Sequence, residues 1–272
     1  MRAKLLGLLL FAALPGWAFA QSTYFVTKVK GAVLRSNGQP LLAGEQVKQS
    51  EPLTLKDTSS AVFVLDDRDI PYKIIAYGGQ ADITDAANFL ATPVRKGQKQ
   101  GSSSTIPDSK IADIASFFSN VRLLLLFNET LLCIDTERLA LSDELMLVFS
   151  FKINGQPVSK RIAYSNGCLT ISKERLLETR LGTIKTELVE GVNAFLYNAK
   201  TKEYKLLATF SLAFEYPEML SKELRIVAKH FKDQGLAPDA IKRSMVSYIS
   251  DFYGTPKAAD AARVIDMAIN AQ

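Results

Sequence analysis

Histidine, tryptophan and cysteine are scarce in this chain of 272 residues, which has one histidine, one tryptophan and two cysteines. The chain also lacks the G-x-S-x-G, H-E-x-x-H and phosphate-loop patterns and any C-x-x-C pair. These patterns place a nucleophile, a zinc ion or a nucleotide phosphate, so their absence argues against the common serine hydrolases, zinc peptidases and nucleotide-binding enzymes. We therefore predict no catalytic residue, no cofactor site and no metal site, and we expect a protein that is not an enzyme.

The one histidine, His230, lies beside Phe231 near the end of a predicted helix. An imidazole at that place more often interacts with the negative end of the helix than serves as a ligand or base. A catalytic base would also need a nucleophile and an orienting partner. We expect a structural role for His230.

The first twenty residues have the three parts of a secretory signal. Arg2 and Lys4 form a basic start, residues 5–14 form an apolar run, and Ala18-Phe19-Ala20 supplies the small residues of a cleavage site. The alternative is a retained membrane anchor, but the run is shorter than the ~20 apolar residues that span a bilayer. We predict that residues 1–20 are removed and that the chain is exported to the periplasm or the outer surface of a Gram-negative-type bacterium. No later stretch predicts a transmembrane span.

The charge and composition of the remaining ~250 residues fit one large domain or two small ones. Removing Arg2 and Lys4 lowers the formal net charge from +5 to +3. This mild excess is not typical of a nucleic-acid-binding protein. A hydrophobic content of 47% is ample for a packed core and argues against global disorder.

The two cysteines, Cys133 and Cys168, lie in strand-like segments. Export permits a disulfide between them. Sequence alone does not show whether their Cα atoms come within bonding range. Two alternatives therefore stay open, a Cys133–Cys168 disulfide and two buried free thiols.

Residues 24–66 predict a small β module. Short strand-like segments alternate with turns, among them Ser36-Asn37-Gly38, where Asn-Gly accepts the positive φ of a tight hairpin. The order of glycines, a glycine–glutamate step and paired leucines resembles the FecR-like and SH3-like small β modules of bacterial envelope proteins. The residues that match are Val29, Gly31, Val33, Leu42, Gly44, Glu45, Val47, Leu53, Leu55, Ser60, Ala61, Phe63 and Leu65. The resemblance covers residues 24–66 only, implies a unit that binds or spaces other components, and implies no catalytic residue. We expect the small β-barrel-like module as a whole to span residues 21–92. The membrane helix and sigma-factor-regulating segment of a full FecR protein are missing.

Residues 93–107 predict a linker, because they combine glycine, serine and bounding prolines without an apolar period. Arg95, Lys96 and Lys99 lie in this segment. They form a candidate interaction surface for an anionic partner, and the alternative is a solvated loop with three scattered charges.

Residues 108–216 predict a β-sandwich of the immunoglobulin-like kind. A short helix is expected at 108–118 and another at 172–178. Leu145, Leu147, Phe149, Phe151 and Ile153 alternate, which places them on the core-facing side of one strand. The turns Asn154-Gly155 and Asn166-Gly167 then predict a three-stranded meander. Strands at 123–127, 131–135, 192–197 and 204–214 bring the expected number to six or seven.

Residues 217–272 predict helices. Leu220, Leu224, Val227 and Phe231 form one helical stripe, and Ile241, Met245, Tyr248 and Phe252 form a second with the same spacing. Gly235 and Pro238 end the first helix and begin the second. We expect an antiparallel helical hairpin and a third, alanine-rich helix that docks on it or frays. The fold class is therefore mainly β with a C-terminal helical segment.

Acidic residues offer the remaining candidate chemistry. Asp66, Asp67 and Asp69 could close around a calcium ion, although their spacing is not that of an EF-hand, and a solvated strand-end turn is the alternative. Asp135, Glu137, Asp143 and Glu144 lie near strand ends, and the geometry of a glycosidase-like pair is invisible in sequence.

Three functions follow from these observations. The favoured one is a non-enzymatic envelope protein that binds protein partners as an adaptor in a secretion, transport or assembly complex, and it predicts an exposed apolar patch or a free sheet edge. The second is a carboxylate-dependent hydrolase of cell-wall or exported polymers, which predicts two carboxylates across a cleft with a raised pKa. The third is a carrier of a small molecule or a metal ion.

Overall fold

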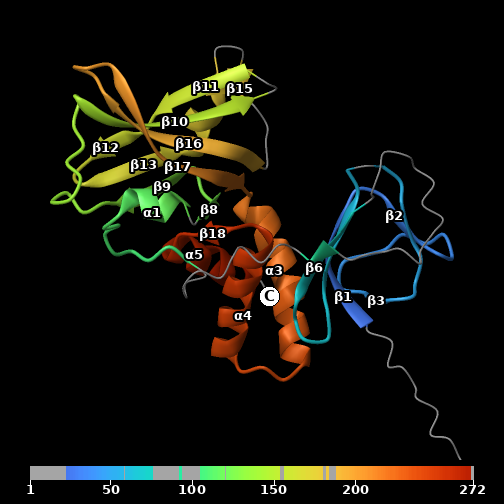
Figure 1. Ribbon diagram of the computed structural model, residues 1–272. Coiled ribbons are helices and arrows are strands. Elements are labelled where there is room, and N and C mark those ends of the chain that lie inside the picture. Colours follow the sequence, from blue (N-terminus) through green and yellow to red (C-terminus); the bar gives the residue numbers. More distant parts are fainter. Residues whose placement is uncertain are drawn as a thin grey trace, which may run out of the picture.

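The computed structural model describes residues 23–57, 59–75, 92–93, 105–119, 121–153, 156–179, 182–183 and 188–270. The predicted signal peptide, residues 1–20, lies outside the described residues, as do Arg95, Lys96 and Lys99 of the predicted linker. The chain is mainly β, with 43% strand and 27% helix, and its helical region is C-terminal, as the sequence predicts. Two β units lie on opposite sides of a layer of helices (Figure 1).

The N-terminal module contains two small sheets around one core. The five-stranded sheet has the order β3-β1-β5-β6-β7 and the two-stranded sheet pairs β2 with β4. Its strands are β1 (Thr23–Lys30), β2 (Val33–Arg35), β3 (Gln46–Lys48), β4 (Leu53–Leu55), β5 (Ala61–Leu65), β6 (Pro71–Ile75) and β7 (Thr92–Pro93). The core residues between the sheets include Val26, Val33, Leu41, Val47, Leu53, Leu55, Val62 and Val64. The described strands do not close into a barrel.

Two glycines of the module occupy conformations that a side chain would strain. Gly31 has φ +73°, and a Cβ there would lie 2.5 Å from Oγ of Ser60. Gly38 has φ +78° and closes the predicted tight turn, with its N–H donating to the Arg35 carbonyl at 2.9 Å. Glycine is the residue that adopts such positive φ values without strain.

The second β unit consists of two facing sheets. The six-stranded sheet has the order β11-β10-β16-β17-β8-β18, the three-stranded sheet has the order β12-β13-β9, and β14 pairs with β15. The strands are β8 (Arg122–Leu125), β9 (Glu129–Cys133), β10 (Leu145–Ile153), β11 (Gln156–Arg161), β12 (Ala163–Ser165), β13 (Cys168–Ser172), β14 (Glu178–Thr179), β15 (Gly182–Thr183), β16 (Leu188–Asn198), β17 (Glu203–Phe214) and β18 (Thr255–Pro256). Two short helices, α1 (Ile114–Ser119) and α2 (Lys173–Leu177), complete the unit. The strand β8 pairs in parallel with both β17 and β18.

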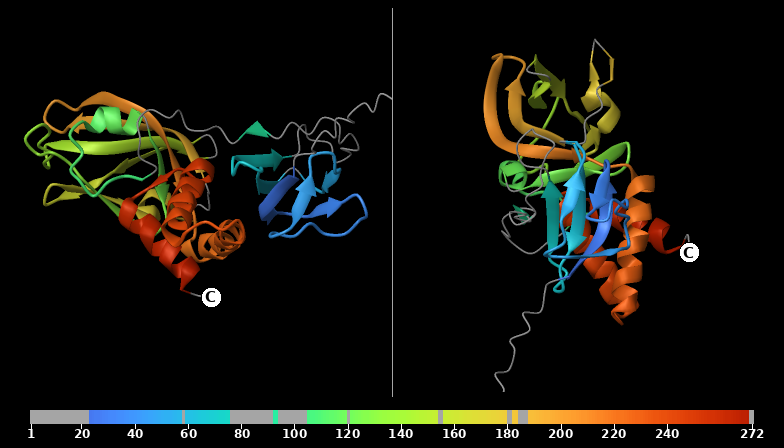
Figure 2. Two further views of the ribbon diagram at one scale, coloured as in Figure 1. Left: turned by 90° about the horizontal axis from the view of Figure 1, so that it is seen from below. Right: turned by 90° about the vertical axis from the view of Figure 1, so that its right-hand side faces the viewer.

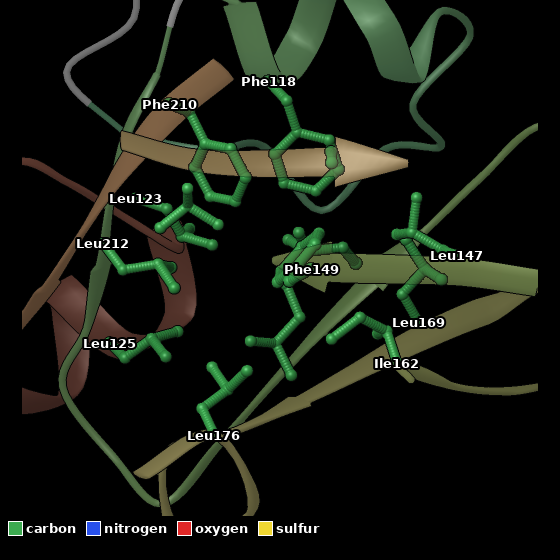
Figure 3. Packing of buried hydrophobic residues seen from close by; sticks show 14 of the residues in the cluster. Phe118, Leu123, Leu125, Leu147, Phe149, Ile162, Leu169, Leu176, Phe210 and Leu212 are labelled. Carbon is green, nitrogen blue, oxygen red and sulfur yellow. The ribbon is translucent and has the colours of Figure 1, made fainter. Parts of the chain in front are cut away.

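Aromatic rings fill the centre of this unit. Phe118 of α1 points between the sheets and meets Phe149 and Phe210, with ring centroids 5.3 and 4.6 Å away (Figure 3). Phe149 and Phe210 are themselves 5.0 Å apart. Such edge and tilted contacts stabilise a core beyond the burial of area. Of the helix predicted over 108–118, only the last part forms, as α1 (Ile114–Ser119), and it carries Phe118.

The predicted meander divides between the two sheets. The hairpin of β10 and β11 forms as expected, with Phe151 opposite Val158, and β12 pairs with β13 across Asn166-Gly167. The return strand ends, however, at the buried Ile162, whose N–H donates to the Leu147 carbonyl at 2.9 Å. After Ile162 the chain crosses to the other sheet, so that the prediction of one continuous meander was wrong. The apolar side chain of Ile162 sits in the core at the crossing (Figure 3).

The helical layer consists of α3 (Pro217–Asp233), α4 (Pro238–Phe252) and α5 (Ala258–Ile269). Their apolar stripes meet in one core that includes Leu220, Leu224, Val227, Phe231, Met245, Phe252, Val264 and Ile265. The third helix therefore docks on the other two, which was one of the two expected outcomes. Gly235, with φ +82°, ends α3 as predicted. Within the described residues, no helix is both long enough and apolar enough to cross a membrane.

Two strands are buried on both faces and connect the helices to the β units. On β8, Leu123 and Leu125 face the sandwich core, whereas Leu124 and Leu126 at its end face the helical core. On β5, Val62 and Val64 face the module core and Ala61, Phe63 and Leu65 face the helices. Strands buried on both faces read as continuous apolar runs. The helical layer thus lies between the two β units (Figure 2).

Candidate functional site

The outer face of the six-stranded sheet carries an exposed apolar surface, which we call the aromatic face. It consists of Met146, Val148, Phe195, Tyr197, Tyr204 and Leu206, of which Tyr204 and Leu206 are exposed, Val148 is buried and the other three are half-buried. In the register of the sheet, Tyr197 lies opposite Tyr204 and Phe195 opposite Leu206, while Met146 and Val148 lie opposite Tyr197 and Phe195. Directly opposed residues of antiparallel strands share a face. Because Leu147 and Phe149 point into the core, the alternate positions on β10 point outward.

The aromatic face is accessible and ordered by ring contacts. The exposed fraction is 59% for Tyr204 and 53% for Leu206. The ring of Tyr204 lies 4.5 Å from that of Tyr197 and 5.9 Å from that of Phe195. Large exposed apolar side chains are unremarkable singly, but a contiguous group of them marks a recognition surface. Tyrosine is also among the residues enriched at protein interfaces.

Charged side chains border the aromatic face. Lys200 pairs with Glu144 at 2.6 Å and Arg161 pairs with Asp143 at 2.7 Å. Lys202 lies in the turn between β16 and β17 and is exposed. Such a polar border around an apolar centre is the usual anatomy of a protein interface.

A second surface feature is an open groove of about 680 Å³ between the sandwich and the start of α3. We call it the Lys173 groove. Its lining includes Phe127, Glu129, Lys173, Tyr216, Glu218 and Arg263. The Lys173 ammonium lies 3.8 Å from the centre of the Tyr216 ring, and the Arg263 guanidinium lies 4.2 Å from the centre of the Phe127 ring. The groove therefore contains two cation–aromatic pairs beside carboxylates.

A buried polar cluster joins β1 of the N-terminal module to α3 and α4. Glu223, which is 5% exposed, accepts hydrogen bonds from the hydroxyls of Tyr248 and Tyr253. Lys28 donates to the Tyr253 hydroxyl at 2.8 Å and lies 3.3 Å from the Glu223 carboxylate. The Tyr248 hydroxyl oxygen also lies within hydrogen-bond distance of Oγ1 of Thr27, at 2.7 Å. Every charged or hydroxyl group of the cluster thus has a partner, which a buried polar network requires.

Burial raises the pKa of Tyr248 and of Tyr253 well above its ordinary value, and the nearby Glu223 carboxylate adds to both shifts. Both phenols therefore stay protonated and serve as hydrogen-bond donors to Glu223. The cluster holds the module against the helices. We assign it a structural role at the junction between the two.

Each of the three aspartates considered for calcium lies in the turn between β5 and β6, and two of them have other partners. Asp66 accepts hydrogen bonds from the N–H groups of Arg68 and Ile70, at 2.9 and 2.7 Å. Asp69 lies 3.4 Å from Nε2 of His230, whose ring stacks on Phe25 at 4.0 Å. His230 therefore links α3 to β1 and to this turn, rather than only to its own helix end.

The other acidic candidates are spread over turns and surface pairs. Asp135 pairs with Arg138 at 3.6 Å, and its carboxylate accepts from the Glu137 N–H. Asp143 and Glu144 form the ion pairs at the border of the aromatic face. In the part of the chain that the structure describes, no group of three or more His, Cys, Asp or Glu side chains is placed to hold a metal ion.

Asp260, in the first turn of α5, is a carboxylate with a raised pKa. Burial raises the pKa, and the Thr130 hydroxyl and the charges of Lys257 and Arg263 act against the rise. The Thr130 hydroxyl donates to the Asp260 carboxylate at 3.3 Å. A hydrolase of the predicted kind would need a second carboxylate across a cleft from it. The hydrogen-bond partner of Asp260 that the structure shows is the Thr130 hydroxyl, and the negative charge of Asp108 adds to the rise of its pKa.

Cys133 and Cys168 form a disulfide with an S–S distance of 2.07 Å, which settles the choice between the two alternatives. They are directly opposed residues of β9 and β13. Both are half-buried, on the side of the three-stranded sheet away from the core residues Leu132 and Leu169.

Comparisons with protein-family models, with curated proteins and with solved structures gave no match. The site must therefore be argued from the side chains alone. Among the described residues, the aromatic face and the Lys173 groove are accessible arrangements that recognition chemistry could use.

Sequence reasoning missed both surfaces. It identified Leu145, Leu147, Phe149 and Phe151 as one face of a strand, but the first two positions between them, Met146 and Val148, are apolar too. That second apolar face was the signal for an exposed patch. The groove left no such signal, because its residues come from four separate parts of the chain.

Proposed function

We propose that this chain is an exported, non-enzymatic binding protein of a bacterial cell envelope. It acts as an adaptor that holds a protein partner on the aromatic face within a secretion, transport or assembly complex. The observation that carries the proposal is the aromatic face itself, with its four-residue centre of Phe195, Tyr197, Tyr204 and Leu206 on the paired strands β16 and β17. An adaptor was expected to expose an apolar patch of this kind.

Export is supported by two independent features. Residues 1–20 have the pattern of a signal peptide. The disulfide between Cys133 and Cys168 is of the type that forms and persists in oxidising compartments and is rare in the cytosol.

The architecture suits an adaptor. Both β units pack on one helical layer through strands that are buried on both faces, β5 and β8. The aromatic face and the helical layer lie on the same outer side of the six-stranded sheet but at different positions along β17: Tyr204 and Leu206 lie near its start, whereas Ala213 near its end packs in the helical core. A partner bound there would leave the N-terminal module accessible to a second component, the binding or spacing role that its resemblance to FecR-like modules implies.

The test is capture of partners from the envelope fraction of cells that produce the protein, after chemical cross-linking. The tagged protein is compared with a double variant, Tyr204→Ser/Leu206→Ser, and with the control Leu131→Ser. Leu131 is 48% exposed but lies on the outer side of the other sheet. We expect a stoichiometric partner that the control retains and the double variant loses.

Thermal melting of all three proteins accompanies the capture, because both substitutions replace exposed side chains and should leave the fold intact. A partner retained equally by the double variant would show that binding does not use the aromatic face. Recovery of no partner, under conditions that keep other envelope complexes together, would also contradict the proposal.

A further inference from the structure

The Lys173 groove holds two cations that no carboxylate neutralises at close range. Within the described part of the chain, neither Lys173 nor Arg263 has an Asp or Glu oxygen within 4.0 Å. Their contacts are aromatic: Tyr216 and Phe214 for Lys173, at 3.8 and 5.8 Å, and Phe127 for Arg263. An aromatic ring holds a cation in place but does not use its hydrogen-bond donors. These donors remain for a ligand.

Lys173 is half-buried at the start of α2, and the burial lowers the pKa of its ammonium group, against the opposing charges of Glu215 and Glu218. The ammonium has therefore lost hydration that no protein carboxylate replaces at contact distance. A ligand carboxylate placed against it would supply the missing charge-assisted hydrogen bonds. The free energy that the Lys173 ammonium loses with its hydration is offset by these bonds when the ligand is bound.

Acidic side chains lie in the same groove. Glu129, Glu174 and Glu218 line it together with Lys173 and Arg263. A ligand with negative charge only would be repelled by the three carboxylates, which disfavours nucleic acid and an anionic membrane surface. A ligand with positive charge only would meet the two cations. The lining is complementary to a ligand that carries both signs of charge close together.

We propose that the Lys173 groove binds a short peptide segment of a protein partner in which acidic and basic side chains follow one another. The acidic side chains contact Lys173 and Arg263, and the basic side chains contact the glutamates. The volume of about 680 Å³ falls within the usual range of ligand sites, roughly 300–1,000 Å³. This inference rests on the proposed binding function and names the chemistry of a second contact, separate from the aromatic face.

The proposal is tested with three fluorescein-labelled peptides of equal length, measured by fluorescence polarisation on the purified mature protein at low ionic strength. One peptide alternates glutamate and lysine between serine spacers, one carries glutamate only, and one carries lysine only. We expect the mixed peptide to bind most tightly and its affinity to fall as salt is added.

Two variants on different elements locate the binding. Lys173→Met keeps the apolar stem over Tyr216 and should weaken the mixed peptide about tenfold, the loss of one charged hydrogen bond. Arg263→Met, at an exposed position, should weaken it about threefold. Lys232→Met, at the far end of α3, is the matched control and should leave the affinity unchanged.

Several results would overturn the inference. Equal binding of all three peptides, no binding of any, or tightest binding of the glutamate-only peptide would contradict the mixed-charge ligand. Unchanged affinity in both Lys173→Met and Arg263→Met would contradict the site. Binding to vesicles of anionic phospholipid that Lys173→Met abolishes would assign the groove to a membrane instead. None of these results bears on the aromatic face, because Lys173 and Arg263 do not belong to it.

Discussion

At the scale of single residues, the least expected feature is a carboxylate buried inside the protein. Glu223 interrupts the apolar stripe of α3 one position before Leu224, and it is almost fully buried. Burying a charge is costly unless it is paired and hydrogen-bonded. The two tyrosine hydroxyls and the Lys28 ammonium meet this requirement. The cluster thus specifies how the N-terminal module docks on the helices.

Glu223→Gln should destabilise the protein by about 2–3 kcal/mol, below the usual range for breaking a buried pair because Lys28 is partly exposed. The measurement is the free energy of unfolding in urea. Asp233→Asn, which breaks the exposed Lys229–Asp233 pair on the same helix, is the control and should cost at most about 0.5 kcal/mol. Equal costs for the two variants would contradict the role given to the cluster.

Alkaline pH should weaken the fold through the same residues. The pKa values of Tyr248 and Tyr253 are raised in the folded protein by burial and by Glu223, whereas unfolded tyrosines ionise near a pH of about 10. Their contribution is complete below that pH and is lost as the pH rises above it, because the unfolded state then releases protons that the folded state keeps.

The free energy of unfolding should therefore fall between about pH 9 and 11. The fall should be less steep in Tyr253→Phe than in the parent, while Tyr204→Phe, which removes an exposed phenol, is the control. Urea titrations followed by circular dichroism measure these slopes. A slope unchanged in Tyr253→Phe would show that this phenol does not contribute.

At the scale of elements, the connection between α4 and β18 depends on one glycine. Gly254 has φ +116°, and a Cβ there would lie 2.6 Å from the carbonyl oxygen of Arg122 on β8. The close approach lets β18 pair in parallel with β8. Through this pairing the helical layer adds a short strand to the sheet of the sandwich.

Gly254→Ala should cost about 2–4 kcal/mol, since it combines backbone strain with a clash against main-chain atoms. Gly235→Ala is the matched control: its φ is +82° and a Cβ there has no atom within 4 Å, so strain alone should cost about 1 kcal/mol. Denaturant midpoints give the comparison. Equal losses of stability in the two variants would contradict the role given to the close approach at Gly254.

The disulfide ties β9 to β13 across a sequence separation of 35 residues. A cross-link of this loop length should stabilise the folded state by about 3–4 kcal/mol, chiefly by restricting the unfolded chain. The double variant Cys133→Ser/Cys168→Ser should show this loss in guanidinium unfolding, and added reductant should produce it in the parent but not in the variant. Equal stability of the parent and the double variant would show that the disulfide does not stabilise the fold.

How far the sequence predicts each element depends on what covers it. The alternation from Leu145 to Phe151 identifies β10, and the uninterrupted run from Leu123 to Leu126 identifies a fully buried strand. Periodicity does not reveal which element lies against a face. The crossing at Ile162 and the helices over Leu124 were therefore not predictable. Met146 and Val148 showed a second apolar face, but only the structure shows that Tyr204 and Leu206 extend it to exposed positions.

At the scale of the whole molecule, the arrangement is two β units on a shared helical layer. The C-terminal helices, which follow both units in sequence, contact Phe63 of the module and Leu124 of the sandwich in one core. The segment that joins the two β units thus lies C-terminal to both of them, apart from the short strand β18. The buried cluster around Glu223 adds a polar contact to this apolar junction.

The candidate surfaces also belong to the whole molecule. Residues from β10, β16 and β17 form the aromatic face, and residues from β8–β9, α2, α3 and α5 form the Lys173 groove. Neither set is contiguous in sequence, and the one candidate surface suggested by the sequence, at Arg95, Lys96 and Lys99, lies outside the described residues. Binding surfaces assembled from distant segments require the fold before they are recognisable.

The central claim is that the aromatic face contacts a protein partner, and site-specific photo-cross-linking tests it most directly. A photo-reactive amino acid replaces Leu206 on the aromatic face or, as the control, Leu131 on the opposite sheet, and cells are irradiated before the envelope is isolated. We predict a discrete cross-linked product from position 206 and none from position 131. A product from position 131 only, or none from either position, would contradict the account.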